Sequence, residues 1–184
     1  MNITFVTGNE NKRREVAAIL DMPGLMSTKI DLPEKQSMDL KEIVTEKLQA
    51  AFKWVGAPVL VEDVSYEVEA VNGFPGPFVK FWEKAGLHDG VMANIEKTGN
   101  SKAKVLCAVA YKDAEHEIIV LETLYGRHVA KTDGKGWGFD FYFIPDGQTE
   151  TFAQMGPERK IQISHRTKAF LAMKEKLQEA GITL

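Results

Sequence analysis

The segment from Asp39 to Asp63 constrains the fold more than any other part of the chain. Its apolar residues recur three and four positions apart, the spacing of one helix face, at Leu40, Ile43, Val44, Leu48, Ala51, Phe52 and Val55. Asp39 is a typical N-cap residue and Gly56 stands just past the last apolar residue, so we expect a helix between them. The compact apolar run APVLVED follows directly and predicts a strand that ends in two acids.

Strand-like and helix-like segments alternate early in the chain, while its middle has a different pattern. NITFV is β-rich, stops at Gly8 and leads into the helix-forming NKRREVAAILD, and MSTKIDLP predicts a second strand ended by Pro33. Two β-rich runs on either side of KDAEH predict an antiparallel hairpin, and SHRTKAFLAMKEKLQEAG predicts a final helix. We therefore expect an α/β fold with a mixed central sheet flanked by helices, in a single domain over residues 1–184.

The composition narrows the classes of partner. The 23 basic and 26 acidic residues give a net charge of −3, which provides no broad basic field for a nucleic-acid polymer. No segment approaches 18 consecutive apolar residues, and the first residues lack the pattern of a secretion signal, so we expect a cytoplasmic protein with no membrane partner. Cys107 is the only cysteine, which excludes an internal disulfide and a CxxC metal site.

The turn after the first strand is a candidate phosphate site. A turn that enters a helix exposes unpaired backbone amides at the positive end of the helix dipole, and Gly8 allows an anion to approach the backbone closely. Thr7 and Asn9 add polar side chains, and Lys12 lies one turn into the helix. The segment matches neither of the common glycine-rich phosphate motifs, so a plain turn with a capping residue is the alternative.

Acidic residues at two strand ends form a candidate metal site. Glu34 follows DLP, and Glu62 and Asp63 end the strand APVLVED. Carboxylate and phosphate oxygens suit Mg²⁺, which keeps several waters and needs few protein ligands, whereas the alternative is that these acids are simply solvated. Lys47 falls within the apolar stripe of the predicted helix, so its ammonium either extends to solvent or meets an anion.

Two further segments combine aromatic and polar groups. GKGWGFDFYF contains Trp137 and Phe139, whose flat rings could stack a nucleotide base. KIQISHR ends in His165 and Arg166, which could donate hydrogen bonds to a carbonyl oxygen. The alternatives are an aromatic core cluster for the first segment and the start of a surface helix for the second.

Taken together, these segments resemble the inosine triphosphate pyrophosphatase family, which hydrolyses non-standard purine nucleoside triphosphates. The matching segments follow the family order and are FVTGNENK with Glu15, IDLPE ending at Glu34, VLVEDVS around Asp63, NGFPGPFVKF with Lys80, GWGFD through Asp140, and KIQISHR through Arg166. They extend from the first strand to the last helix. The resemblance implies two lobes around a nucleotide-binding cleft, a homodimer, and Mg²⁺-dependent cleavage of a nucleoside triphosphate into monophosphate and pyrophosphate.

The resemblance also implies roles for individual residues. Phosphate or other substrate contacts would be made by Thr7, Gly8, Asn9, Lys12, Lys47, Lys80 and Lys160. Metal would be bound by Glu34 and Asp63, with Glu15 and Glu62 as helpers. The base pocket would comprise Trp137, Gly138, Phe139, Asp140, His165 and Arg166. Catalysis would depend on Asp63, Glu34 and Lys12, with water attacking the α-phosphorus, Asp63 or a metal-bound hydroxide supplying the base, and lysines stabilising the leaving pyrophosphate.

Substrate preference follows from the base. Donors aimed at a 6-oxo group would accept ITP, dITP and XTP, whereas the 6-amino group of ATP would leave those donors unpaired. The chain departs from the family pattern at Val64, Ser65 and Tyr66, where a hydroxyl residue and a small residue commonly follow the acids, and at Phe141, where Pro is common. Two alternatives therefore stay open: a pyrophosphatase for a pyrimidine or other modified triphosphate, and a nucleotide-binding protein without turnover.

Overall fold

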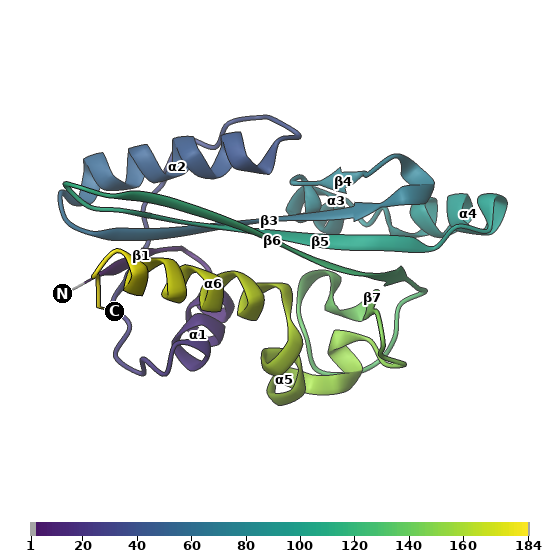
Figure 1. Cartoon of the computed structure of the whole chain (residues 1–184). Coiled ribbons are helices and arrows are strands. Elements are labelled where there is room, and N and C mark those ends of the chain that lie inside the picture. Colours follow the sequence, from purple (N-terminus) through teal and green to yellow (C-terminus); the bar gives the residue numbers. More distant parts are fainter. Residues whose placement is uncertain (1–2, 184) are drawn as a thin grey trace. The chain divides into compact units, whose positions relative to one another are not determined.

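The computed structural model describes residues 3–183 and divides into two compact units. Unit 1 combines the residues up to Asp63 with Cys107–Glu122 and the segment from His165 onward, and unit 2 consists of Val64–Leu106 and Thr123–Ser164. Three strands, β3, β5 and β6, contribute residues to both units. Figure 1 labels most of the helices and strands. The single domain over the whole chain and the nucleotide-binding cleft stay predictions.

Unit 1 is a layered arrangement of strands and helices. Its elements are β1 (Thr4–Val6), α1 (Glu10–Ile19), β2 (Ser27–Thr28), α2 (Leu40–Val55), the first half of β3 (Val59–Val68), the last part of β5 (Lys102–Lys112), the first part of β6 (Glu117–His128) and α6 (His165–Glu179). The strand order is β2-β1-β3-β5-β6, and β1 runs parallel to both β2 and β3. In Figure 1, α2 covers one face of these strands, and α1 and α6 cover the other.

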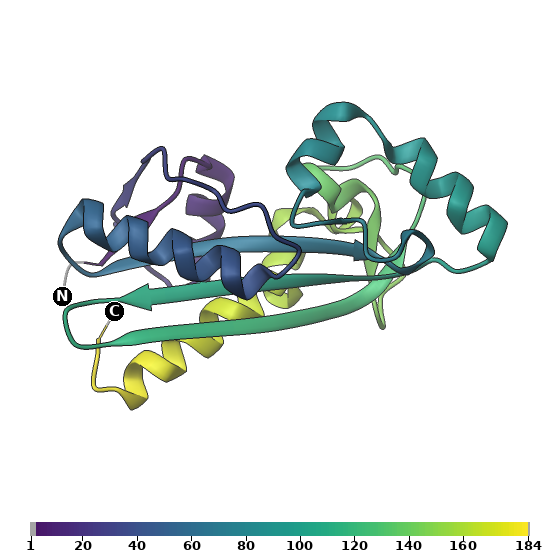
Figure 2. The ribbon, with the colours of Figure 1, turned by 90° about the horizontal axis from the view of Figure 1, so that it is seen from above.

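The helix predicted from the apolar period is confirmed as α2. The Asp39 side chain accepts hydrogen bonds from the backbone N–H groups of Lys41 and Glu42, and Gly56 ends the helix in the left-handed conformation with φ of 66°. The buried residues of α2 belong to the predicted stripe and are Leu40, Ile43, Val44, Leu48 and Ala51. Figure 2 shows α2 running along the strands of unit 1, which explains why this stripe is apolar.

The other face of these strands is packed by the first and last helices. The rings of Phe5 in β1 and Phe170 in α6 meet edge to face, with centroids 5.7 Å apart. Val16 of α1 is completely buried, and Met173 and Leu177 of α6 are buried as predicted from their spacing. The first strand, the first helix and the last helix therefore pack in one core.

Unit 2 contains shorter elements around the remaining parts of β3, β5 and β6. These are η1 (Glu69–Val71), β4 (Pro75–Gly76), α3 (Val79–Ala85), α4 (His88–Thr98), η2 (Gly138–Phe141), β7 (Phe143–Pro145) and α5 (Phe152–Ile163). β4 pairs antiparallel with β3, with Tyr66 opposite Gly76, and β7 pairs antiparallel with β6, with Gly126 opposite Pro145. Parallel and antiparallel pairs occur together, so the predicted mixed sheet is confirmed.

The predicted hairpin is also present, while two predicted strands are shorter than expected. β5 and β6 are sheet neighbours joined by a four-residue turn, in which the Asp113 N–H donates to the His116 carbonyl. The strand expected in MSTKIDLP is confined to Ser27–Thr28. In GWGFDFYF the strand is limited to β7, because Gly138–Phe141 forms a 3₁₀ turn. None of the described helices is long and apolar enough to cross a membrane.

The buried stripe of α2 provides a test of this packing. Leu48 is fully buried, so Leu48→Ala should lower the free energy of unfolding by about 2–5 kcal/mol through lost burial and the cavity left behind. The exposed Lys41→Ala on the same helix should change it by less than about 0.5 kcal/mol. Urea unfolding measures both, and equal stability of the two variants would contradict the packing described for α2.

Candidate active site

The turn between β1 and α1 is built from its own side chains. The Thr7 hydroxyl accepts a hydrogen bond from the Asn9 N–H at 3.1 Å, and Asn9 Oδ1 accepts from the N–H groups of Asn11 and Lys12 at 2.9 and 3.2 Å. Asn9 is therefore the N-cap of α1, as the plain-turn interpretation expected. A Cβ on Gly8 would lie 3.2 Å from Lys29 Cγ, so the side chain of Lys29 lies against this turn. The sequence alone did not indicate Lys29 as a site residue.

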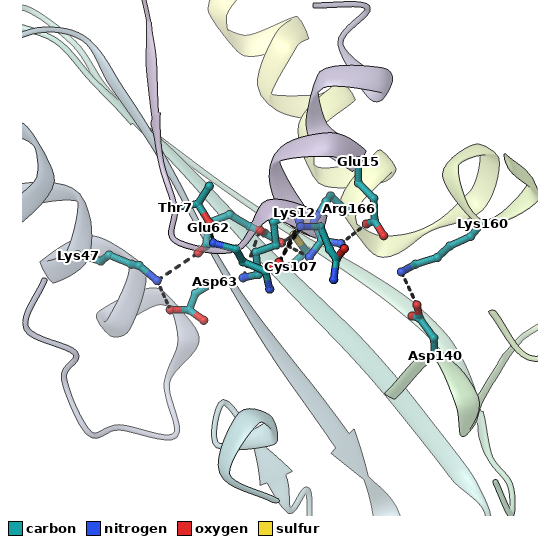
Figure 3. Close-up of polar contacts among 12 residues, drawn as sticks. Thr7, Lys12, Glu15, Lys47, Glu62, Asp63, Cys107, Asp140, Lys160 and Arg166 are labelled. Carbon is teal, nitrogen blue, oxygen red and sulfur yellow. Dashed lines mark hydrogen bonds and ion pairs between the residues drawn. The ribbon is translucent and has the colours of Figure 1, made fainter. Parts of the chain in front are cut away.

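A cluster of ionised side chains lies next to this turn at the middle of β3 (Figure 3). Arg166 donates to Glu62 Oε1 from Nε at 2.9 Å and from Nη2 at 2.7 Å, and its Nη1 pairs with Glu15. Lys12 Nζ lies 3.3 Å from the other Glu62 oxygen, and the Cys107 thiol donates to Oε1 at 3.5 Å. The cluster connects α1, α6, β3 and β5 within unit 1.

The positive and negative side chains of this cluster stabilise one another in their charged forms. Burial on its own would raise the pKa of Glu62, but Arg166 and Lys12 outweigh it and hold that pKa well below its usual range. Glu62 and Glu15 likewise raise the pKa of Arg166 although its burial opposes them. Arg166 is 1% exposed and held by two carboxylates, so the geometry makes it an anchor between α6, α1 and β3. Its predicted contact with a base stays a prediction.

Lys47 reaches from α2 to the middle of β3. Its Nζ donates to Asp63 Oδ2 at 3.0 Å and to the Glu62 carbonyl oxygen at 3.3 Å. Burial would lower the pKa of Lys47, but Asp63, Glu34 and Glu62 together raise it, so the side chain is an ammonium at neutral pH. Of the two interpretations of its position in the apolar stripe, the contact with an anion is the one observed.

The carboxylates around Lys47 are the candidate metal ligands. Residues 3–183 contain no group of three or more His, Cys, Asp or Glu side chains already placed around one point. Asp63 and the exposed Glu34 both act on the charge of Lys47, and both offer only oxygen donors. Such a set suits Mg²⁺, which takes its remaining ligands from water and phosphate, so the chemistry of the residues present fits this ion.

In unit 2, Asp140 organises the aromatic loop. Its Oδ2 accepts from the Trp137 N–H at 3.0 Å and from Lys160 Nζ at 2.8 Å, and both side chains of this ion pair are buried. Lys160 Nζ also lies 4.9 Å from the centre of the Trp137 ring, within range of a cation–π contact. Asp140 thus caps the 3₁₀ turn, and Lys160 supports the loop. The predicted contact of Lys160 with phosphate stays a prediction, as does that of the exposed Lys80 on α3.

Phe139 is held by residues that the site prediction did not include. Its ring stacks on Tyr66 with centroids 4.7 Å apart and planes 6° apart, and the side chain of Phe139 is buried. The Tyr66 hydroxyl and His128 Nδ1 form a hydrogen bond of 2.7 Å. Burial lowers the pKa of His128 to about 4, with a smaller effect from His88, so this histidine is neutral at pH 7. The only sequence signal for the stack of Tyr66 on Phe139 was the unusual Tyr66 shortly after Glu62 and Asp63. These two acids were predicted to end a strand, but β3 continues through them to Val68.

Comparisons with known proteins agree with this architecture. Residues 3–176 match the Ham1 family. The chain belongs to the Ham1 family. It is 36% identical over 173 residues to a dITP/XTP pyrophosphatase of Methanopyrus kandleri, covering 92% of each chain, and 39% identical over 177 residues to inosine triphosphate pyrophosphatase 2 of Trypanosoma cruzi, covering 94% of this chain and 90% of that one.

Solved structures of Ham1 proteins share the fold. The Staphylococcus aureus Ham1 protein superposes with a TM-score of 0.81 at 23% identity, covering 97% of this chain and 99% of that one. A HAM1 protein from Coxiella burnetii gives a TM-score of 0.80 at 23% identity, covering 96% and 98%. The Ham1 fold therefore extends over nearly the whole chain.

The buried Arg166–Glu62 pair has consequences for acid stability. Because the folded-state pKa of Glu62 lies below its usual value of 4.5, its carboxylate stabilises the fold above that pH and contributes less as the pH falls. Glu62→Gln should therefore lower the free energy of unfolding at pH 7 by about 3–5 kcal/mol, by leaving Arg166 under-compensated, and should flatten the loss of stability below pH 5.

Urea unfolding at a series of pH values measures both effects. Glu10→Gln is the matched control, because Glu10 pairs with Arg13 at the exposed start of α1 and its loss should change stability little. A Glu62→Gln variant with the stability of the control at pH 7 would show that the buried pair does not anchor unit 1.

Proposed function

We propose that this protein is a Mg²⁺-dependent nucleoside triphosphate pyrophosphatase that converts ITP, dITP and XTP to the monophosphate and pyrophosphate. The main support is the 36–39% identity, over at least nine tenths of both chains, to proteins named dITP/XTP or inosine triphosphate pyrophosphatases. The lysines and carboxylates gathered in unit 1 provide the chemistry that such a reaction needs. The enzyme would act in the cytoplasm as a homodimer and remove damaged nucleotides from the pool.

Triphosphate binding would use charges that are now paired within the protein. The N-terminal amides of α1 and the Thr7–Asn9 turn present a positive helix end, and Lys12 lies beside it. Lys47 would exchange Asp63 for a phosphate oxygen, which leaves this carboxylate available in the middle of β3. Bound Mg²⁺ would neutralise phosphate charge there, with Glu34 and Asp63 as its protein ligands.

Hydrolysis would proceed in one step at the α-phosphorus. Asp63 would accept a proton from the attacking water, and Lys12 and Lys47 would stabilise the negative charge that develops on the departing pyrophosphate. The P–O bond between the α-phosphorus and the bridging oxygen breaks as the bond to water forms, so no covalent intermediate with the protein is needed. Glu62 would hold Lys12 in place through the ion pair described above.

Base selection would depend on a 6-oxo group. Trp137 offers a ring for stacking, while Phe139 and Asp140 are engaged in holding the loop. Hydrogen-bond donors that line the base site would pair with the 6-oxo oxygen of hypoxanthine or xanthine. Adenine carries a 6-amino group instead, which would leave a donor facing a donor and make ATP a poor substrate.

A substrate panel tests the activity. The protein with Mg²⁺ is incubated separately with ITP, XTP, dITP, GTP, ATP and UTP, and the nucleotide products, pyrophosphate and orthophosphate are measured. We expect IMP, dIMP or XMP with pyrophosphate and little product from ATP. Turnover of UTP alone would favour a pyrimidine enzyme. Thermal stabilisation by ITP without any product would indicate a binding protein instead.

Substitutions in unit 1 test the assignment of residues. Asp63→Asn removes the proposed base while keeping an oxygen for Lys47, and Lys12→Ala removes a positive charge from the proposed phosphate site. Each should lower kcat/KM for ITP by at least about 100-fold. Lys53→Ala, at an exposed position of α2, should leave it unchanged. Wild-type rates in both site variants, with normal thermal melts, would show that the reaction occurs elsewhere.

A further inference from the structure

Glu83 holds the backbone of the aromatic loop in unit 2. This residue lies on α3, which packs against η2, and its carboxylate accepts a hydrogen bond from the Phe139 N–H. A Cβ on the neighbouring Gly138 would lie 2.7 Å from Glu83 Oε1, and Gly138 has a φ of +63°, in the left-handed region. The backbone of Gly138 and Phe139 therefore lies close against the Glu83 carboxylate, and the left-handed conformation at position 138 favours glycine.

The surroundings of the Glu83 carboxylate disfavour its charged form. Burial raises the pKa of Glu83 to about 7 and the Asp140 charge adds to this, while the hydrogen bond from Phe139 acts in the opposite direction. Because the fold disfavours the charged form of Glu83, ionisation of this carboxyl group lowers the free energy of unfolding. A role other than stabilising the fold therefore explains why an acid stands at this position. Its position against the backbone of a loop that carries the half-buried Trp137 ring supplies that reason.

The other contacts of the loop hold different parts of it. Asp140 binds the Trp137 N–H and Lys160, and Tyr66 stacks on the Phe139 ring. These contacts restrain the two ends of the turn and one side chain. The Glu83 hydrogen bond restrains the backbone between Trp137 and Asp140, and so the direction in which the Trp137 ring leaves the chain.

We propose that Glu83 is a positioning residue for substrate binding, which holds the Phe139 amide and thereby the Trp137 ring, and which holds them more firmly once its carboxyl group has lost its proton. The inference rests on the proposed function, because it assigns Trp137 to the nucleotide base. Glu83 does not touch the reacting phosphates in this scheme, so it affects KM rather than the chemical step.

The direction of the pH effect follows from the hydrogen bond. An ionised acceptor binds an N–H more strongly than a neutral one, so the loop tightens and KM for ITP falls as the pH rises through about 7. The charged or titratable groups that face Glu83 are Asp140 of η2 and Tyr142 just after it, and Asp140 is itself paired with Lys160. Burial, with smaller effects from Glu83 and Asp89, raises the pKa of Tyr142 above its usual value of 10, so Tyr142 does not change charge between pH 6 and 8.

Two variants separate the hydrogen bond from the charge. Glu83→Ala removes the acceptor and should raise KM for ITP about tenfold at pH 8, with kcat changed less than about twofold. Glu83→Gln keeps an oxygen acceptor but cannot ionise, so it should show the wild-type KM at pH 6 and lack the fall in KM between pH 6 and 8. Glu96→Ala, an equal loss of charge at an exposed position of α4, should follow the wild-type profile.

Hydrogen exchange gives a readout that needs no substrate. The Phe139 amide should lose protection in Glu83→Ala and keep it in Glu83→Gln, while thermal melts establish that both variants fold. If the wild type does not hydrolyse ITP, the proposed function fails, but the exchange result still tests the contact with the loop. If the wild type is active and Glu83→Ala changes neither KM nor exchange, or loosens the amide without raising KM, the positioning role is overturned.

Discussion

The buried pair of Arg166 and Glu62 is the interaction on which unit 1 depends. It joins residues 104 positions apart in sequence and, through Glu15, ties the last helix to the first. Burying two charges costs free energy of hydration, and well-packed apolar residues at the same positions would stabilise the fold at least as well. A buried ion pair is therefore most useful where it fixes the positions of other side chains. Here it places Glu62 against Lys12, and the next residue of the strand, Asp63, holds Lys47.

This arrangement explains how one site can hold both lysines and acids close together. Each ammonium neutralises a carboxylate in the protein as it stands, so the cluster is stable before any ligand arrives. A triphosphate would supply new anionic partners for the lysines, and a divalent cation would supply a new partner for the carboxylates. Each side chain would therefore exchange one partner of opposite charge for another. The same principle operates in unit 2, where Lys160 neutralises Asp140 and so fixes the turn that carries Trp137.

Local patterns made much of the fold predictable from the sequence. The helix α2, the hairpin and the mixed sheet follow from apolar spacing and turn residues. The position of Lys47 in the apolar stripe left two outcomes open, extension to solvent or contact with an anion, and the structure shows the contact with Asp63. Contacts between distant segments were not predictable, because no periodicity connects Arg166 to Glu62 or Tyr66 to Phe139. Aromatic residues after Gly138 indicated a strand, but the left-handed glycine and the Asp140 cap turn the chain into a 3₁₀ helix first.

The central claim is that the residues around β3 direct water to the α-phosphorus of a nucleoside triphosphate. Hydrolysis of ITP in ¹⁸O-labelled water, with mass spectrometry of both products, tests it most directly. The account predicts that the label enters IMP and that the released pyrophosphate carries none. Label in the pyrophosphate would place the attack at the β-phosphorus, and label in orthophosphate would place it at the γ-phosphorus, and either result would contradict the mechanism built on Asp63, Lys12 and Lys47.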